Sequence, residues 1–227
     1  MRFQRKFMIF AAHPDDEILG CGATAARYVV EGYTGRCIIL SQGMLSRGED
    51  FRKKTEWLKK DSEEANKIIG INDISFYNFP DNSFDSVPLL EIIKTIEMEI
   101  FDFKPDVIFT HFGQDLNIDH RRTFEAVMTA CRPVPGFLNP DIYSFYIPSS
   151  TDWVDGFCLK PFYPNFFVDV SEYIEIKLKA LSCYTSEMRE YPHSRSIQAM
   201  RIFSQYWGNR IGFEFVEPMI LIRKILE

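Results

Sequence analysis

Residues 7–17 read Phe-Met-Ile-Phe-Ala-Ala-His-Pro-Asp-Asp-Glu, an apolar run that ends in one imidazole and three carboxylates. A short apolar run of this kind is typical of a buried strand, and Pro14 prevents the strand from continuing. In open α/β sheets, ligands bind at the carboxyl ends of the strands. Because neighbouring carboxylates repel one another unless a cation lies among them, the turn at 13–17 predicts a metal site at the end of the first strand.

Strand and helix patterns alternate through the first 131 residues. The apolar segments expected to be strands lie at 7–12, 36–41, 74–77 and 106–111. The segments expected to be helices lie at 18–30, 51–69, 87–101 and about 120–131. The strands begin about every thirty residues, the length of a βαβ unit. We therefore expect an α/β fold with a Rossmann-like, mostly parallel sheet and helices on both faces.

The chain changes character after residue 131, where prolines and aromatic residues become frequent. Loops, short strands and two helices are expected in this C-terminal part. Ser171 is predicted to cap the first of these helices, and Ser194 or Ser196 the second. The last segment, 218–226, fits either a strand or a helix.

Length and composition limit the classes of protein that fit. At 227 residues the chain is long enough for one sizeable core, so we predict a single domain. It would have a Rossmann-like core at about 1–131 and an extension at about 132–227 that lines the pocket. The net charge of −6 argues against a nucleic-acid binder, which normally presents a basic face.

No segment approaches the ~20 apolar residues of a membrane span. The basic start is followed by an apolar run of only about six residues, shorter than the core of a signal peptide. The five cysteines include no Cys-x-x-Cys pair, which argues against a thiolate zinc site. Their odd number and apolar surroundings predict reduced thiols in a cytoplasmic protein.

A second polar cluster, Thr-His-Phe-Gly-Gln-Asp-Leu-Asn-Ile-Asp-His-Arg-Arg at 110–122, follows the strand expected at 106–111. If this strand runs parallel to the first, His13, Asp16 and His120 project from the same edge of the sheet. Two histidines and one carboxylate leave coordination positions for water, which is the pattern of a catalytic zinc site. Asp15 would then stand beside the metal as the general base that activates water.

Each cluster also has a structural interpretation. The turn at 13–17 fits a solvated acidic loop, and its Glu17 fits a charge at a helix N-terminus. Asp119 and His120 fit the cap and first turn of the following helix. His111 still lies on the strand, where a histidine is more often packed in the core than bound to a ligand.

The motifs His-Pro-Asp-Asp-Glu at 13–17 and Asn-Ile-Asp-His at 117–120 resemble those of the LmbE-like (PIG-L type) metal-dependent deacetylases. The segment 17–24, EILGCGAT, and the segment 206–219, YWGNRIGFEFVEPM, also match the pattern of this family, so the resemblance covers nearly the whole chain. It implies one Zn²⁺ per chain, with other divalent metals left open. The zinc ligands that it implies are His13, Asp16 and His120.

The resemblance implies hydrolysis of an N-acetyl group on an amino sugar or sugar conjugate. Zinc would polarise the acetyl carbonyl, while Asp15 takes a proton from water and returns it to the leaving amine. Many members carry a histidine where this chain has Asn117. The amide of Asn117 is a competent but neutral oxyanion donor, so the identity of the acid is left open.

Substrate contacts are implied at two further positions, Arg47 after the second strand and Asp81 after the third. Arg47 also fits a charge on a surface loop, and Asp81 also fits the first residue of an Asx-turn. His193 and Arg195, in the segment YPHSRS, fit a loop that covers the pocket and touches the substrate.

Three alternatives to an N-acetyl sugar deacetylase follow from the same residues. One is an amidase of the same family that acts on a thiol-sugar conjugate. The second is a non-haem iron oxygenase, which uses two histidines and one carboxylate as well, although usually on a β-barrel. The third is a catalytically silent sugar-binding or metal-binding module, which would have no need of Asp15. The expected partner is a small N-acetylated sugar or conjugate, and a homo-oligomer is left open.

Overall fold

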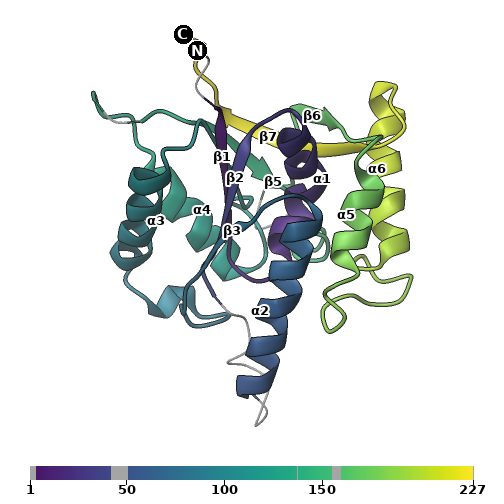
Figure 1. Cartoon of the computed structure of the whole chain (residues 1–227), viewed down its shortest axis with the longest axis horizontal. Coiled ribbons are helices and arrows are strands. Elements are labelled where there is room, and N and C mark those ends of the chain that lie inside the picture. Colours follow the sequence, from purple (N-terminus) through teal and green to yellow (C-terminus); the bar gives the residue numbers. More distant parts are fainter. Residues whose placement is uncertain (1–3, 42–50, 137, 155–159, 227) are drawn as a thin grey trace.

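The computed structural model of the chain describes residues 4–41, 51–136, 138–154 and 160–226 (Figure 1). Its strands are β1 (Lys6–Ala11), β2 (Thr34–Ile39), β3 (Asp73–Phe76), β4 (Val107–Thr110), β5 (Asp141–Phe145), β6 (Phe166–Asp169) and β7 (Val216–Arg223). Its α-helices are α1 (Asp16–Val30), α2 (Phe51–Ile68), α3 (Leu89–Phe103), α4 (Ile118–Ala130), α5 (Ile174–Leu181) and α6 (Ile197–Ile211). A short 3₁₀ helix, η1 (Phe84–Ser86), precedes α3.

One sheet contains these seven strands, in the order β3-β2-β1-β4-β5-β7-β6. The first five positions are parallel, and β7 runs antiparallel between β5 and β6. Figure 1 shows α3 and α4 on one face of the sheet and α1, α2, α5 and α6 on the other. The predicted mostly parallel α/β sheet with helices on both faces is therefore confirmed.

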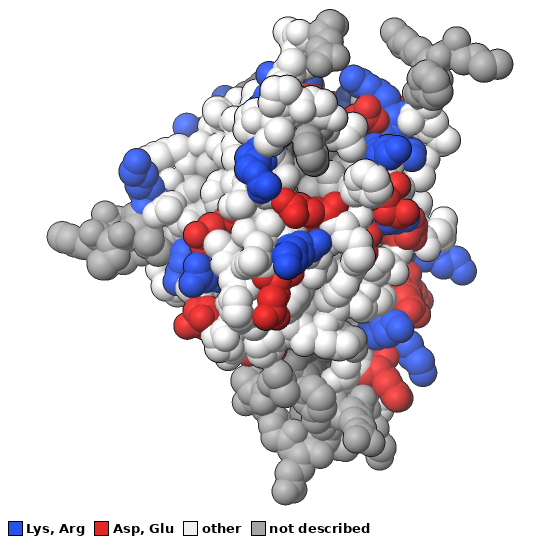
Figure 2. Space-filling view, turned by 90° about the vertical axis from the view of Figure 1, so that its left-hand side faces the viewer, with Lys and Arg blue, Asp and Glu red and all other residues white. Residues whose placement is uncertain are grey.

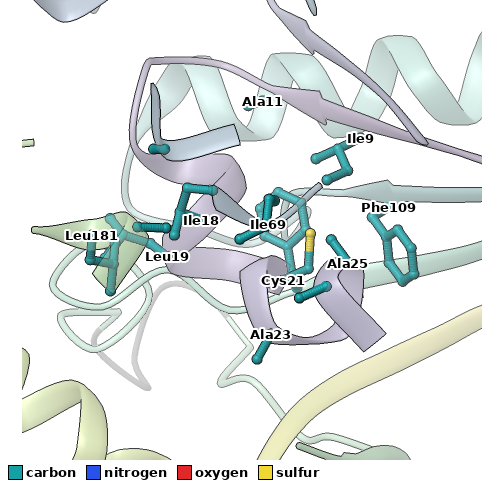
Figure 3. Close-up of a cluster of buried hydrophobic side chains, with 14 of the residues drawn as sticks. Ile9, Ala11, Ile18, Leu19, Cys21, Ala23, Ala25, Ile69, Phe109 and Leu181 are labelled. Carbon is teal, nitrogen blue, oxygen red and sulfur yellow. The ribbon is translucent and has the colours of Figure 1, made fainter. Parts of the chain in front are cut away.

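The central strand β1 explains the apolar run that opens the chain. Alternate side chains of a strand point to opposite faces. Accordingly, Phe7, Ile9 and Ala11 pack into the core beneath α1, whereas Met8 and Phe10 pack into the core beneath α3 and α4. Figure 3 shows part of the first core, where side chains of β1, α1 and β4 meet. A strand that is covered on both faces must be apolar at every position.

Helix α1 approaches the sheet closely because of a glycine. A Cβ atom on Gly20 would overlap the ring of Phe145 on β5, so a larger residue would force the helix away from the sheet. The helix is also interrupted one residue later, at Cys21, where φ is −144°. This interruption separates the first turn, which carries Asp16, from the remainder of α1.

The C-terminal part provides partners for the backbone groups at the interruption of α1. The carbonyl oxygen of Leu19 accepts a hydrogen bond from Nζ of Lys177 at 2.8 Å, and the N–H of Thr24 donates to Glu217 at 2.7 Å. Lys177 and Glu217 form an ion pair of 2.6 Å, and both side chains are buried. This pair ties α5 and β7 to the start of α1.

The structure answers three questions about the C-terminal part that the sequence left open or answered wrongly. Ser196 caps α6 as expected, since its hydroxyl accepts a backbone hydrogen bond in the first turn. The prediction for Ser171 was wrong, because α5 begins three residues later. The Ser171 hydroxyl instead donates to Asp169 and accepts from the N–H of Phe215, which joins the end of β6 to the start of β7. The last segment, which fitted a strand or a helix, is strand β7.

Seen from the side of α3, the surface carries basic and acidic side chains that are interspersed (Figure 2). Several of the charged residues on α3 are paired. Arg36 on β2 contacts Glu99 and Asp102 at 3.1 and 2.7 Å, and Arg132 contacts Glu97 at 3.2 Å. Among the helices of the described residues, none is long and apolar enough to cross a membrane.

Candidate metal centre and active site

The two polar clusters lie on the turns that follow β1 and β4. These strands are neighbours in the sheet, and the strand order reverses between them. The turn after β1 leads into α1, whose first residue is Asp16. The turn after β4 leads into α4, whose N-cap is Asn117 and whose first turn contains His120. A reversal of strand order opens a crevice at the carboxyl ends of the strands, where ligands bind in this class of fold.

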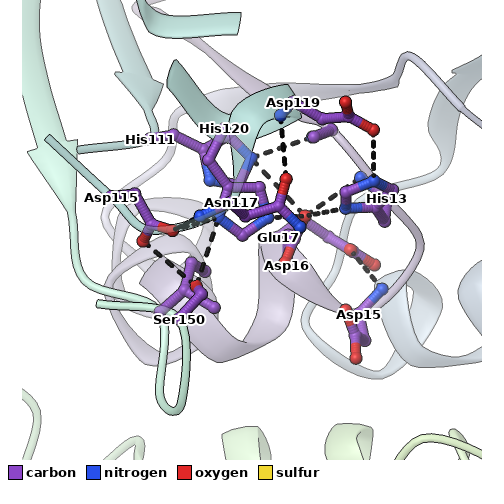
Figure 4. A network of polar contacts seen from close by, with 12 residues as sticks. His13, Asp15, Asp16, Glu17, His111, Asp115, Asn117, Asp119, His120 and Ser150 are labelled. Atoms are coloured by element: carbon purple, nitrogen blue, oxygen red, sulfur yellow. Dashed lines mark hydrogen bonds and ion pairs between the residues drawn. The ribbon is translucent and has the colours of Figure 1, made fainter. Parts of the chain in front are cut away.

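Ligand atoms of His13, Asp16 and His120 converge at this edge, all within 4.8 Å of one another. Nδ1 of His13 and Nε2 of His120 each lie 3.2 Å from Oδ2 of Asp16 (Figure 4). Oδ1 of Asp16 is buried, and it has no hydrogen-bond partner within the described part of the chain. One carboxylate and two imidazole nitrogens, once these are deprotonated, fit a divalent cation of the zinc type.

In His13 and in His120, the ring nitrogen that points away from Asp16 contacts a buried carboxylate. Nε2 of His13 lies 2.9 Å from Oδ2 of Asp119, and Nδ1 of His120 lies 3.1 Å from Oδ1 of Asp115 (Figure 4). Histidines that bind a metal usually donate their second N–H to such a carboxylate, which fixes the ring and its tautomer. The arrangement turns Nδ1 of His13 and Nε2 of His120 toward Asp16.

The carboxylates also set the charge of the two histidines. Burial would lower the pKa of His13, but hydrogen bonds to Asp119 and Asp16 outweigh it and raise the pKa to about 10. For His120, the Asp16 charge and the bond to Asp115 likewise outweigh burial and raise the pKa to about 9. Without a metal, both imidazoles are therefore protonated at neutral pH. A cation that binds here must displace protons.

His111 directly follows β4, and it is the packed core histidine that the sequence favoured. It is fully buried, its ring stacks on that of His120 at 4.0 Å, and its Nε2 accepts a hydrogen bond from the N–H of Ala12 at 2.8 Å. Burial and the neighbouring His120 hold its pKa well below the usual range, so it is neutral. The neutral ring of His111 packs against the ring of His120 and helps to hold it in place.

Asp15 occupies a strained position beside the converging ligand atoms. Its φ of 102° lies in the region that L-residues rarely adopt, and the residue is 2% exposed. Its N–H donates to Oε2 of Glu17 at 3.0 Å, and its Oδ2 accepts a hydrogen bond from Nη1 of Arg195 at 2.9 Å. Burial raises the pKa of Asp15 well above the ordinary value, and Arg195 opposes the rise. A raised carboxyl pKa is typical of a general base that works near neutral pH.

Glu17 is more than a charge at a helix N-terminus. It is fully buried, and it accepts hydrogen bonds from Nδ2 of Asn66 at 2.8 Å and from the hydroxyl of Tyr184. Burial raises its pKa to about 7. Because its other oxygen holds the N–H of Asp15, Glu17 supports the strained turn rather than facing water. The sequence pattern, an acid in a first helical turn, did not reveal this burial.

A cavity of about 340 Å³ lies next to this centre. Its lining residues are Leu116, Asn117, Ser149, Ser150, Trp153, Glu187, Arg189, His193 and Arg195. Of the residues with an expected role, Asn117, His193 and Arg195 are thus brought to one cavity. Asn117 uses its Oδ1 to cap α4, while its Nδ2 makes a 3.3 Å contact with Oδ1 of Asn82. His193 lies edge-on to the exposed ring of Trp153 at 6.3 Å.

Asp81 lies on the other side of His13, with its Oδ1 3.3 Å from Nε2 of that histidine. Ligand atoms of His13, Asp81 and Asp119 therefore also lie within 4.8 Å of one another. Asp119 is already used, because its two oxygens accept the N–H groups of Asn82 and Phe84 at 2.6 and 2.9 Å. The group that contains Asp16 fits a cation better, because Oδ1 of Asp16 has no partner among the described residues. Arg47 lies outside the described residues.

Several residues that the sequence patterns did not single out complete the centre. Asp115 and Asp119 lie within the polar cluster at 110–122. Their place beside a histidine in a loop was the signal in the sequence that could have identified them. Ser150 and Thr151 donate hydrogen bonds to Oδ2 of Asp115 at 3.1 and 2.5 Å. These hydroxyl residues follow β5 in a loop that has no recognisable motif.

The chain is similar to known deacetylases. Residues 8–131, more than half of the chain, match the PIG-L family, described as GlcNAc-PI de-N-acetylase. The chain is 29% identical over 189 residues to the uncharacterized deacetylase YaiS of Escherichia coli (strain K12), covering 81% of this chain and 92% of that protein. It is 24% identical over 223 residues to the diacetylchitobiose deacetylase of Thermococcus kodakarensis, covering 94% and 81%.

A solved structure is similar along the whole chain. The conserved protein TT1542 from Thermus thermophilus superposes with a TM-score of 0.76 and 26% identity, covering 97% of this chain and 96% of the other. The likeness therefore includes the C-terminal part as well as the sheet that carries the candidate centre.

Proposed function

The chain belongs to the PIG-L family, and from this premise we propose that it removes an N-acetyl group from an amino sugar or sugar conjugate. One Zn²⁺ per chain would be held by His13, Asp16 and His120. The observation that carries the proposal is the convergence of the ligand atoms of these three residues, with Oδ1 of Asp16 buried and unpartnered among the described residues, beside the raised-pKa carboxyl of Asp15. This combination supports the metal-assisted hydrolysis of an amide.

A divalent cation held by these residues supplies a Lewis acid, which lowers the pKa of water and polarises a carbonyl. Asp15 takes the proton of the attacking water as general base. The resulting Asp15 carboxylic acid then returns that proton to the leaving nitrogen, so that acetate and a free amine are released. Asn117 donates a hydrogen bond from Nδ2 to the carbonyl oxygen as negative charge develops there. This donation replaces its 3.3 Å contact with Asn82.

An N-acetylated sugar suits the neighbouring cavity. Its lining combines the exposed ring of Trp153 with the polar side chains of Arg189 and His193. Aromatic faces and polar groups together bind the apolar and hydroxylated sides of a sugar ring. The relative from Thermococcus kodakarensis is named a diacetylchitobiose deacetylase, which supports the same class of substrate for this chain. We assign further sugar contacts to Arg47 and Asp81.

The test is acetate release from a panel of N-acetylated sugars, nucleotide sugars and thiol-sugar conjugates, with zinc supplied and with zinc removed by a chelator. The Asp15→Asn variant should bind as much zinc as the wild type and lose acetate release. Unchanged acetate release by this variant would show that Asp15 is not the base. Activity on the thiol-sugar conjugates alone would favour the amidase alternative.

Two further outcomes address the other classes. Oxygen uptake with bound iron, without acetate release, would favour an oxygenase. Sugar binding without turnover of any compound in the panel would favour a binding module. The parallel α/β sheet argues against the oxygenase, whose metal triad usually lies on a β-barrel.

A further inference from the structure

Three of the four non-glycine residues with positive φ in the described part of the chain surround the candidate centre. They are Asp15 (102°), Asn82 (52°) and Ser149 (77°); the fourth, Lys104, ends α3. Residues held in such conformations cluster at active sites, where the surrounding structure must hold them in place. Asp15 belongs to the turn after β1, whereas Ser149 belongs to the turn after β5.

One side chain joins two of these strained turns. Nη1 of Arg195 donates to Oδ2 of Asp15 at 2.9 Å, and Nε of the same guanidinium donates to Oγ of Ser149 at 3.1 Å. The Asp15 side chain is 3% exposed, and that of Arg195 is 21% exposed. The planar guanidinium presents its donors in a rigid fork, so two fixed acceptors determine its position.

Arg195 is itself well anchored. It directly precedes Ser196, the N-cap of α6, and its carbonyl oxygen accepts a hydrogen bond from the N–H of Arg189 at 3.2 Å. Its guanidinium donates to Asp15 and Ser149, neither of which is one of the three metal-ligand candidates. Arg195 therefore holds the base through a direct hydrogen bond to Asp15 rather than through one of the metal-ligand candidates.

We propose that Arg195 is a positioning residue for the base: it fixes Oδ2 of Asp15, so that Oδ1 is the oxygen that takes the proton. This inference rests on the proposed function for the identity of the reaction. Glu17 holds the backbone of Asp15 by accepting a hydrogen bond from its N–H, whereas Arg195 holds the side chain of Asp15. A misplacement of about 1 Å at a reacting group lowers turnover about a hundredfold.

The experiment compares Arg195→Ala and Arg195→Lys with the control Arg201→Ala. Arg201 also pairs with a carboxylate, that of Glu175 at 2.5 and 2.8 Å, but on the exposed side of α6. For Arg195→Ala we expect kcat to fall about a hundredfold with KM changed less than about threefold and zinc content unchanged. Arg195→Lys should recover only part of kcat because an ammonium cannot bridge both acceptors. Arg201→Ala should match the wild type.

Added guanidinium ion provides a readout that a general loss of structure would not produce. It should partly restore kcat of Arg195→Ala and have no such effect on Asp15→Asn. A kcat within about threefold of the wild type, or a rise in KM with kcat unchanged, would overturn the proposal. Loss of zinc from Arg195→Ala would overturn it as well, since Arg195 would then maintain the metal centre rather than the base.

If Arg195→Ala fails to fold, Ser149→Ala tests the same fork, and we expect a smaller fall in kcat at unchanged KM. A crystal structure of either variant tests the inference without any substrate. We expect the carboxylate of Asp15 to have rotated, and an unmoved carboxylate would contradict the proposal. Absence of acetate release by the wild type, in contrast, would refute the proposed function and leave this structural result standing.

Discussion

The two parts of the chain contribute to the candidate centre in different ways. The N-terminal part, residues 4–131, provides every side chain that we expect to touch the metal. The C-terminal part, residues 132–226, provides none of these side chains. It provides partners for residues that lie next to the candidate ligands. Thr151 donates to Asp115, Tyr184 donates to Glu17, and Arg195 donates to Asp15. The N-terminal part thus carries the residues that we expect to bind the metal and to react, and side chains of the C-terminal part contact them or their neighbours.

The sharpest test of this division removes a ligand from the N-terminal part. His120→Asn should abolish zinc binding and lower acetate release about a thousandfold or more, because metal activation contributes several kcal/mol to the transition state. His193→Asn, a histidine of the C-terminal part, should keep its zinc. Elemental analysis of both purified variants measures the difference. Zinc retained by His120→Asn would place the metal elsewhere.

The second test asks how strongly the C-terminal part stabilises α1. Lys177→Met would leave Glu217 buried without its cation, and we expect a loss of about 3–5 kcal/mol in the free energy of unfolding. The double variant with Glu217→Gln should recover part of this loss, since no uncompensated charge remains. Urea denaturation measures both.

A surface ion pair of the same C-terminal part serves as the control. Lys224 contacts Asp141 at 2.8 Å, with the lysine side chain 42% exposed. Lys224→Ala should cost less than about 1 kcal/mol, because water screens an exposed pair. Equal losses for Lys177→Met and Lys224→Ala would show that the buried pair does not anchor α1.

The third test uses pH, and it concerns the histidines of the N-terminal part without metal. The pKa values of His13 and His120 are raised in the folded protein to about 10 and about 9, above the ordinary 6.5. Their stabilisation is therefore complete below about pH 6.5 and is lost as the pH rises through 9 to 10. We expect the free energy of unfolding of the zinc-free protein to fall by a few kcal/mol, on the order set by these shifts, between about pH 7 and pH 10.

Zinc should remove this pH dependence, because it replaces the protons on the two histidines. Binding near pH 7 should accordingly release protons. Calorimetric titration with zinc in two buffers of different ionisation enthalpy measures that release. Binding without proton release would contradict the charged state assigned to the histidines.

The smallest expected effects concern the carboxylate that contacts His120 and a hydroxyl that donates to this carboxylate. Asp115→Asn weakens the carboxylate that orients His120 and should lower zinc affinity about 10–100-fold. Thr151→Val acts from the C-terminal part and removes one of the hydrogen bonds to Asp115. Ser150 and the N–H of Asn117 keep theirs, so we expect a loss of less than about tenfold. Competition with a chelator measures both affinities. Thr129→Val, which removes an exposed hydroxyl from α4, should leave the affinity unchanged.

Two predictions from the sequence stay predictions, the division of a single domain at about residue 131 and the cytoplasmic location. The assembly into a homo-oligomer, which the sequence left open, stays open. The zinc ligands, the base and the sugar contacts likewise await the experiments above. The family membership and the α/β fold do not, because the match over 8–131 and the sheet order establish them.

Local patterns were enough to predict a mostly parallel sheet and the polar character of its carboxyl edge. Strand β1 is recognisable because both of its faces are buried, and His13, Asp16 and His120 are recognisable because polar residues at strand ends are expected to meet. The side chains that hold these residues in place follow from the fold and not from any local pattern. Arg195 lies 180 positions from Asp15, and Tyr184 lies 167 positions from Glu17. A buried polar group takes as its partner whatever the fold brings within hydrogen-bond distance, and a single arginine or tyrosine in a loop has no local pattern that reveals that choice.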